Sequence, residues 1–215
     1  MTRRFSCVSM PRGGLGLLLL VVGCESADNR QSMRPEGTLP VRYESAEDYS
    51  TCLVASVCMT GNYILGRRAL TEPSMRAALR RSGLDETRVG DVRQHLQENG
   101  LHLIALREAN IEDKPPLGLK YWLQRRGYPV ICVINRDPQA DPAFNHAVVI
   151  IGISPSAEDE SSDIIHYFDP SSAAQLHSDA RAVFEGLWDR CDRAMLLVVQ
   201  PPKDLPDDSG IKESS

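Results

Sequence analysis

The chain has 215 residues, of which 42% are hydrophobic, 6% aromatic and 25% charged. These fractions are typical of a globular domain and exclude collagen-like, low-complexity and wholly disordered chains. The 24 basic and 29 acidic residues give a formal net charge of −5, and no run of Lys and Arg stands out. The composition therefore predicts no nucleic-acid partner. The length fits one domain with flanking tails.

The first 24 residues have the pattern of a targeting segment. Arg3 and Arg4 supply positive charge, and an apolar run follows from Gly13 to Gly23. As a helix this run would span roughly 16 Å, which is short of the ~30 Å core of a bilayer. The ending Leu20-Val-Val-Gly-Cys24 resembles the lipobox of bacterial lipoproteins, in which the cysteine is lipidated and becomes the new N-terminus. The resemblance implies lipidation of Cys24; the alternative is an ordinary secretory signal followed by a coincidental cysteine.

This pattern divides the chain into four segments. We expect a lipoprotein signal peptide over residues 1–23, a polar tether over 24–40, a folded domain over 41–200 and a disordered tail over 201–215. No later stretch is apolar enough to span a membrane. The protein is thus expected in the cell envelope, as a membrane-associated lipoprotein on the extracytoplasmic side.

Helices are predicted in the first half of the domain. Residues 53–65 carry apolar side chains at helical spacing, Ser50 or Thr51 can cap the N-terminus, and Gly66 fits the C-terminal stop. Further helices are predicted over residues 73–81, 91–98 and 117–126.

Strands are predicted mainly in the second half. Short apolar, β-branched runs indicate strands over residues 101–106, 128–135, 146–153, 164–168 and 195–199. A further helix is predicted over residues 178–190, with Val183, Phe184, Leu187 and Trp188 on one face. Helices followed by strands indicate the α+β fold class.

Cys52 is a candidate nucleophile. It lies at the first turn of the predicted helix 53–65. Unpaired backbone N–H groups and the helix dipole at that position favour a thiolate. Position alone is a weak signal, because most cysteines with apolar neighbours are buried and inert.

His146 and Asp169 strengthen this interpretation. The strands 146–153 and 164–168 are joined by an acidic loop that suits a hairpin. If the strands pair symmetrically about the loop, His146 and Asp169 lie directly opposite each other and point to the same face. The carboxylate could then orient the imidazole as the general base of an acyl-transfer reaction.

These residues together resemble the peptidase C39-like family of the papain-like cysteine peptidases. The stretch from Cys52 to Tyr63, with Ala55 and Gly66, resembles the nucleophile helix of that family. The stretch Phe144-Asn-His-Ala-Val-Val-Ile-Ile-Gly152 resembles its histidine strand, and Tyr167-Phe-Asp-Pro170 its acid motif. The resemblance covers roughly residues 42–200. It implies a papain-like fold in which N-terminal helices pack on a C-terminal antiparallel sheet, with a Cys52–His146–Asp169 triad.

Two departures from the family pattern concern the oxyanion hole. The family usually has Gly after the nucleophile and Gln six residues before it, where this chain has Leu53 and Ala46. The neighbouring Glu47 and Asp48 are anionic and would oppose an oxyanion. Loss of one side-chain hydrogen-bond donor from an oxyanion hole lowers kcat by a factor on the order of 10²–10³.

The other cysteines do not predict a metal site or a cofactor. Cys58 lies too far along the helix from Cys52 to bridge to it. The spacings of the six cysteines match no zinc pattern. A disulfide from Cys58 or Cys132 to Cys191 is possible in an exported protein, and the sequence does not choose between them.

Three functions remain open. The first is a cysteine peptidase, a hydrolase of peptide or amide bonds, acting on a peptide or protein substrate. The second is a catalytically weak, peptide-binding module that retains the cleft, which the absent Gln at position 46 favours. The third is an acyl transferase that uses the same thioester intermediate. Retention of all three polar residues favours the hydrolase.

Overall fold

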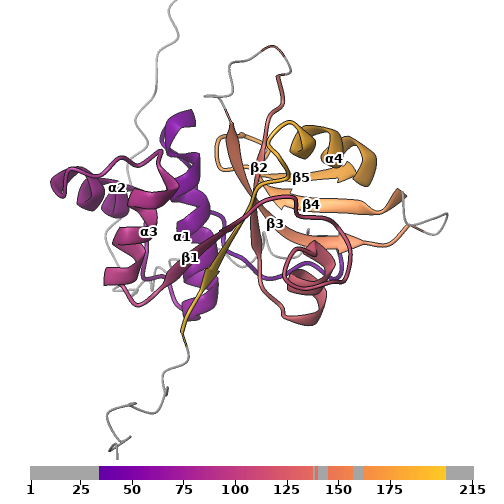
Figure 1. Ribbon diagram of the computed structural model, residues 1–215, viewed down its shortest axis with the longest axis horizontal. Helices are drawn as coiled ribbons and strands as arrows, with labels where there is room; N and C mark the ends of the chain where they lie inside the picture. Colours follow the sequence, from indigo (N-terminus) through magenta and orange to yellow (C-terminus); the bar gives the residue numbers. More distant parts are fainter. Residues whose placement is uncertain (1–33, 138, 140–144, 157–161, 202–215) are drawn as a thin grey trace, which may run out of the picture. The chain divides into compact units, whose positions relative to one another are not determined.

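The computed structural model describes residues 34–137, 139, 145–156 and 162–201, which lie in one compact unit. The predicted signal peptide, the lipidation candidate Cys24 and the predicted tail after residue 201 lie outside these residues. Within the unit, helices α1–α3 lie on one side and β2–β5 with α4 on the other, while β1 lies beside α1 and α3 (Figure 1). The fold is α+β, as the order of elements predicts.

The helices of the first half are α1 (Cys52–Leu65), α2 (Glu72–Arg81) and α3 (Val89–Glu98), each within two residues of its prediction. Gly66 ends α1 with φ 64°, a left-handed conformation that glycine adopts without a Cβ clash. Thr51, one of the two predicted caps, is the N-cap residue of α1, but its side chain makes no capping hydrogen bond there. A turn of 3₁₀ helix (Tyr49–Thr51) precedes α1, and Asp48 caps that turn by accepting a hydrogen bond from the Ser50 amide.

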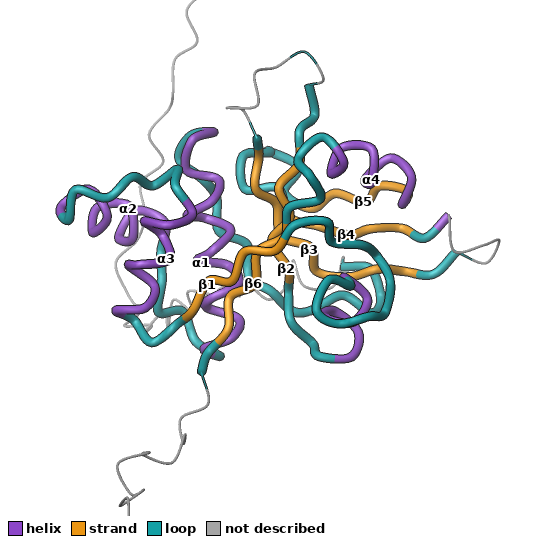
Figure 2. Tube along the Cα trace, viewed as in Figure 1, coloured by secondary structure: helices purple, strands orange, loops and turns teal. Residues whose placement is uncertain are grey.

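One antiparallel sheet holds all the strands found in the described residues, in the order β1-β6-β2-β3-β4-β5. Their bounds are β1 (His102–Leu106), β2 (Val130–Ile134), β3 (His146–Ser154), β4 (Ile164–Phe168), β5 (Leu176–Ala180) and β6 (Met195–Val199). Figure 2 shows β6 between β1 and β2, so the last strand of the domain joins its first and second strands.

Two predicted helices differ from the structure. The predicted helix 178–190 begins only at α4 (Arg181–Asp189), because Leu176–Ala180 forms the edge strand β5. Val183 of α4 is 56% exposed rather than buried. The predicted helix 117–126 is shortened: Leu119 and Lys120 are α-helical and lead directly into a π-helical turn, η3 (Tyr121–Arg125). Gly118 belongs to the preceding loop, where a Cβ would lie 2.0 Å from the Glu112 carbonyl oxygen.

The hydrophobic core lies on both faces of the sheet, which explains the continuous apolar run of β3. Ala147, Val149 and Ile151 pack in the cluster that includes α1, whereas Val148 and Ile150 pack with α4 and η3. Side chains of a strand alternate between faces, so a strand covered on both sides is apolar at every position. Each such buried Val or Ile contributes about 1.5–3 kcal/mol.

The segment before α1 is attached to β3 at a bulge. The β3–β4 register shifts between Ile150 and Gly152, and the amide of Leu39 donates to the carbonyl of Ile151 at 2.7 Å. A Cβ at Gly152 would lie 2.8 Å from Cγ2 and 3.0 Å from Cα of Thr38. Glycine at 152 therefore permits the close approach of the N-terminal segment.

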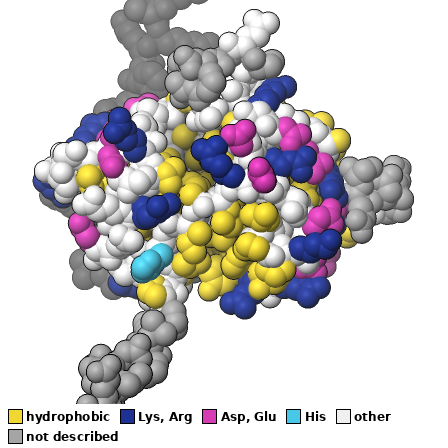
Figure 3. Space-filling model, viewed as in Figure 1, with side chains coloured by type: hydrophobic (Ala, Val, Ile, Leu, Met, Phe, Trp, Pro, Cys, Tyr) yellow, Lys and Arg dark blue, Asp and Glu magenta, His cyan; other side chains and the backbone are white. Residues whose placement is uncertain are grey.

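The surface shown in Figure 3 carries hydrophobic side chains gathered where the chain between β1 and β2 lies. Ile104 of β1, 42% exposed, is one of the exposed large hydrophobic residues. Among the described residues, no helix has the length and apolarity that a bilayer crossing needs.

Candidate active site

Cys52 is the first residue of α1, and its position is fixed from two directions. The turn capped by Asp48 delivers the chain to the helix, with Thr51 Oγ1 accepting hydrogen bonds from the amides of Glu47 and Asp48. The Cys52 sulfur accepts a hydrogen bond from the Ala147 amide at 3.3 Å, and the residue is 5% exposed. The helix N-terminus and this amide both direct N–H dipoles at the sulfur.

His146 is the first residue of β3 and is 1% exposed. Its Nε2 lies 2.6 Å from Oδ1 of Asp169. Its Nδ1 is buried and makes no hydrogen bond within the described part of the chain. Because Asp169 occupies Nε2, the Nδ1 atom is the ring nitrogen left for chemistry with the neighbouring Cys52.

The aromatic ring of Tyr49 covers His146. The two rings stack at a centroid distance of 4.6 Å and an interplanar angle of 21°, and Tyr49 is itself 44% exposed. The tyrosine thereby separates the imidazole from solvent on one face. The helical pattern of the sequence gave no sign of this contact, because Tyr49 precedes the periodic segment.

The hairpin prediction brought His146 and Asp169 together, but its register is wrong by two residues. The observed pairs near this end are Val149 with Phe168 and Ile150 with Tyr167. Continued, this register places Asp169 beside Val148, diagonal to His146. At the loop end the register differs by three, because Ser154 rather than Ile151 pairs with Ile164, and the bulge after Ile150 takes back one residue. A shift of two keeps both side chains on the same face, and diagonal neighbours remain within reach.

The Asp169 carboxylate has partners on both oxygens. Oδ1 accepts from His146 and from the amide of Ser171 at 2.9 Å, while Oδ2 lies 3.3 Å from Nη2 of Arg136. Burial alone would raise the pKa of Asp169, but the hydrogen bonds from His146 and Ser171 and the charges of His146 and Arg136 outweigh it and lower the pKa.

The same contacts hold a proton on His146. Burial lowers its pKa, but the hydrogen bond to Asp169 and the negative charges of Cys52 and Asp169 outweigh burial and raise the pKa to about 9. The imidazole is therefore an imidazolium near neutral pH, which is the form that pairs with a thiolate.

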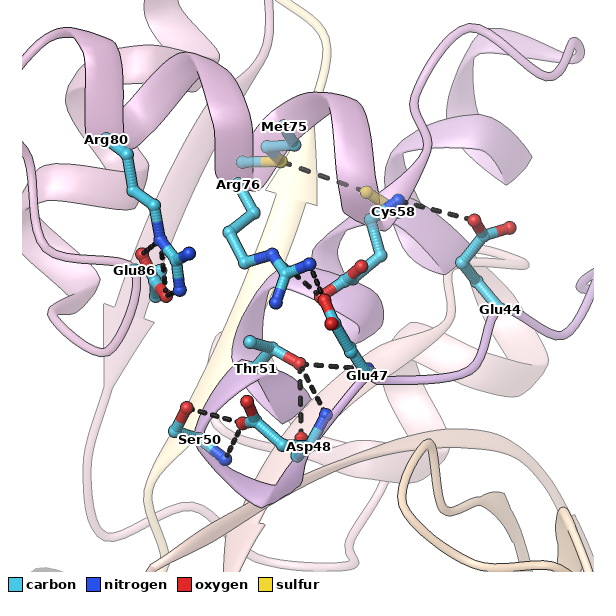
Figure 4. Close-up of polar contacts among 11 residues, drawn as sticks. Glu44, Glu47, Asp48, Ser50, Thr51, Cys58, Met75, Arg76, Arg80 and Glu86 are labelled. Atoms are coloured by element: carbon cyan, nitrogen blue, oxygen red, sulfur yellow. Dashed lines mark hydrogen bonds and ion pairs between the residues drawn. The ribbon is translucent and has the colours of Figure 1, made fainter.

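The segment before Cys52 supplies no side-chain donor at position 46. The Ala46 amide donates to the carbonyl of Pro170 at 2.9 Å, which ties this segment to the chain beyond Asp169. Glu47 forms an ion pair with Arg76, and the Asp48 carboxylate accepts hydrogen bonds from the amide and hydroxyl of Ser50 (Figure 4). The expected opposition of these acids to an oxyanion is thereby weakened.

The remaining cysteines stand apart from this site. Cys58, Cys132 and Cys191 are free thiols, as is Cys52, so neither disulfide left open by the sequence forms. Burial raises the pKa of all three. In the described ranges, no group of three or more potential ligands could hold a metal ion.

No protein-family model matches the sequence, and no curated protein matches it significantly. Solved structures do match. A double glycine motif protease from an AMS/PCAT transporter, in complex with a leader peptide, has a TM-score of 0.52 and 17% identity, over 77% of this chain and 96% of that chain. The peptidase domain of Streptococcus ComA, a bi-functional ABC transporter, has a TM-score of 0.52 and 11% identity, over 76% and 98%.

A structure described as a C39-like peptidase from Bacillus anthracis has a TM-score of 0.55 and 15% identity, over 77% of this chain and 98% of that chain. Each of these likenesses spans nearly the whole of the other chain, 96–98% of it. The chain therefore has the papain-like α+β fold of the C39 peptidase domains.

Proposed function

We propose that the protein is a cysteine hydrolase that cleaves peptide or amide bonds, with Cys52 as nucleophile, His146 as acid and base, and Asp169 as the group that orients the imidazole. The observation that carries the proposal is the buried His146–Asp169 hydrogen bond beside a cysteine at a helix N-terminus. These are the three functions that thiol-based acyl transfer requires.

In this mechanism the Cys52 thiolate attacks the carbonyl carbon of the scissile bond and forms a C–S bond. The tetrahedral intermediate collapses as the C–N bond breaks, and His146 gives its Nδ1 proton to the leaving amine. Water then attacks the thioester while the neutral His146 takes a proton from it. The C–S bond breaks, and the carboxylic acid and the thiolate–imidazolium pair are formed. An acyl transferase would use an amine or alcohol in place of that water.

A peptide is the proposed substrate. The fold is shared with a protease that is described in complex with a leader peptide, which supports a cleft suited to an extended chain. The proposed reaction requires no cofactor, because the thiolate and the imidazolium together supply the nucleophile and the acid.

A catalytically weak, peptide-binding module is the second candidate, and Ala46 favours it. A methyl group stands where the C39-like pattern has an oxyanion-stabilising Gln. The hydrolase must then stabilise the oxyanion with backbone amides at the N-terminus of α1, which is a smaller set of donors.

Alkylation by iodoacetamide at pH 6, followed by mass spectrometry of each cysteine, tests the proposal. We expect Cys52 to react at least roughly tenfold faster than Cys191, because only Cys52 has a helix N-terminus and an imidazolium to hold the thiolate. Cys191 is a matched control for access, since the two residues are 7% and 5% exposed. In the His146→Ala variant, Cys52 should lose most of its higher alkylation rate relative to Cys191.

Cleavage of a mixed pool of synthetic decapeptides, with Cys52→Ser as control, completes the test. Cleavage that is lost in Cys52→Ser supports the hydrolase. If Cys52 reacts no faster than Cys191 and His146→Ala changes nothing, the residues do not act together, and the binding module is the better account.

We also propose that the protein is a lipoprotein anchored through Cys24. The support is the sequence alone: positive residues, a short apolar run and a terminal Gly-Cys pair. The anchor would hold the hydrolase at a membrane surface on the extracytoplasmic side of the cell envelope, where its substrates would be exported or surface peptides.

A further inference from the structure

Arg136 contacts the candidate site although the sequence does not mark it. It lies two residues after β2, and its Nη2 atom is 3.3 Å from Oδ2 of Asp169. The same nitrogen donates to the hydroxyl of Tyr167 at 2.9 Å, and the guanidinium carbon lies 5.8 Å from the Tyr167 ring centroid. The arginine therefore joins the acid of the site to a buried residue of β4.

This contact divides the two oxygens of Asp169 between different partners. Oδ1 faces His146, and Oδ2 faces Arg136. A carboxylate that rotates about its Cβ–Cγ bond turns Oδ1 away from the imidazole. A cation held at Oδ2 opposes that rotation and keeps the carboxylate ionised.

The position of Arg136 is itself built by three elements. The Tyr167 side chain is fully buried, and its hydroxyl donates to Oδ2 of Asp179 on β5 at 2.6 Å, which leaves the oxygen lone pairs to accept from Arg136. The backbone before Arg136 is anchored by α4, because the Asn135 amide donates to Leu187 and the Asn135 carbonyl accepts from Arg190. The guanidinium is thus held in place rather than free to follow Asp169.

We propose that Arg136 is a positioning residue: it holds Asp169 ionised and oriented so that Oδ1 keeps the His146 imidazole protonated and directed at Cys52. The catalytic consequence rests on the proposed hydrolase, whereas the effect on the imidazole does not. The charged and titratable groups that face His146 are Cys52 from α1, Asp169 after β4 and Tyr49 before α1, with His177 of β5 acting at longer range.

The titration of His146, followed by NMR of the labelled imidazole, separates positioning from simple electrostatics. Arg136 and the imidazolium carry the same charge. If Arg136 acts only through its charge, its removal raises the midpoint of the titration. If it positions Asp169, Arg136→Gln lowers the midpoint, by about one pH unit.

Arg136→Lys and Arg107→Gln complete the set of variants. Lysine keeps the charge and loses the planar fork, so its midpoint should fall between those of the wild type and Arg136→Gln. Arg107, 75% exposed in an ion pair with Asp192, gives the same change of net charge without contact with the site. Its loss should leave the midpoint unchanged. In an Asp169→Asn background, Arg136→Gln should have no further lowering effect.

Peptide cleavage gives the second readout. We expect Arg136→Gln to lower kcat roughly tenfold and to leave KM unchanged, because the arginine acts on the base and not on the substrate. An unchanged or raised midpoint in both Arg136 variants would overturn the positioning role even if peptides are cleaved. A lowered midpoint without cleavage by the wild type would support positioning while the hydrolase fails. If Arg136→Gln does not fold, the lysine variant alone decides, because a midpoint equal to that of the wild type overturns the proposal.

Discussion

At the scale of single residues, the proton on His146 is the property on which the proposed chemistry depends. Its pKa is raised to about 9, above the ordinary value of 6.5. A group whose pKa is higher in the folded than in the unfolded state stabilises the fold fully below its unfolded pKa. That contribution is lost as the pH rises through the folded pKa, here between pH 6.5 and about 9.

We therefore expect the free energy of unfolding of the wild type, relative to His146→Gln, to be nearly constant between about pH 5 and 6.5 and to fall by on the order of 3 kcal/mol as the pH rises past 9. Below this plateau the difference also falls, because protonation of Asp169, whose pKa His146 lowers, breaks the pair. Urea unfolding over this range measures the difference. Asp169→Asn should make the fall smaller, because it removes the main partner that raises the pKa. A difference that does not vary with pH would contradict the ion pair.

The residues that face one another at the site could be predicted only in part. Cys52, His146 and Asp169 were found from helix position, strand order and family resemblance, because each lies at the end of a regular element. Arg136 and Tyr49 were missed, since their contacts depend on where non-repetitive backbone leads after β2 and before α1. The spacing of residues along the sequence does not predict which residue of another element a side chain in an irregular segment will contact.

At the scale of elements, the close contact between the N-terminal segment and the bulge in β3 can be tested by adding a single methyl group at Gly152. Gly152→Ala places a Cβ against the backbone and side chain of Thr38, which must then move away from the strand. We expect a destabilisation of about 1–3 kcal/mol, the usual cost of overpacking, measured by urea unfolding.

Gly186→Ala is the matched control. Gly186 is exposed in α4, and a Cβ there meets nothing within 4 Å. Alanine favours a helix over glycine, so this variant should gain about 0.5–1 kcal/mol. If both variants change stability equally, the contact of Thr38 with β3 contributes nothing.

The elements themselves were largely predictable. β3 could be predicted because its apolar residues form a short continuous run, as in a strand that is buried on both faces. α1 could be predicted because its apolar residues recur at helical spacing. The edge strand β5 was not predictable, since His177, Ser178 and Asp179 are polar and only half the strand is covered. The register of β3 with β4 also escaped prediction, because β3 extends to Ser154 beyond its apolar run and the bulge leaves no mark on apolar periodicity.

At the scale of the whole molecule, the proposed anchor would decide where the proposed hydrolase acts. We predict that Cys24→Ala releases the protein into the soluble fraction or leaves the precursor uncleaved, because the lipid-bearing cysteine is then absent. Fractionation and the mass of the N-terminal peptide measure this. Cys7→Ala, which changes a cysteine outside the apolar run, is the control. Unchanged membrane association and processing in Cys24→Ala would overturn the proposed anchor.

The contacts of Thr38 and Leu39 with β3 also determine where a mechanical force on the N-terminal segment would act on the domain. Tension that passes along the chain from an anchor at Cys24 reaches the folded unit at the Leu39–Ile151 hydrogen bond and the Thr38–Gly152 contact. The same strand begins with His146. A pull between envelope and domain is therefore resisted by the interior strand that carries the proposed base, and not by a peripheral loop.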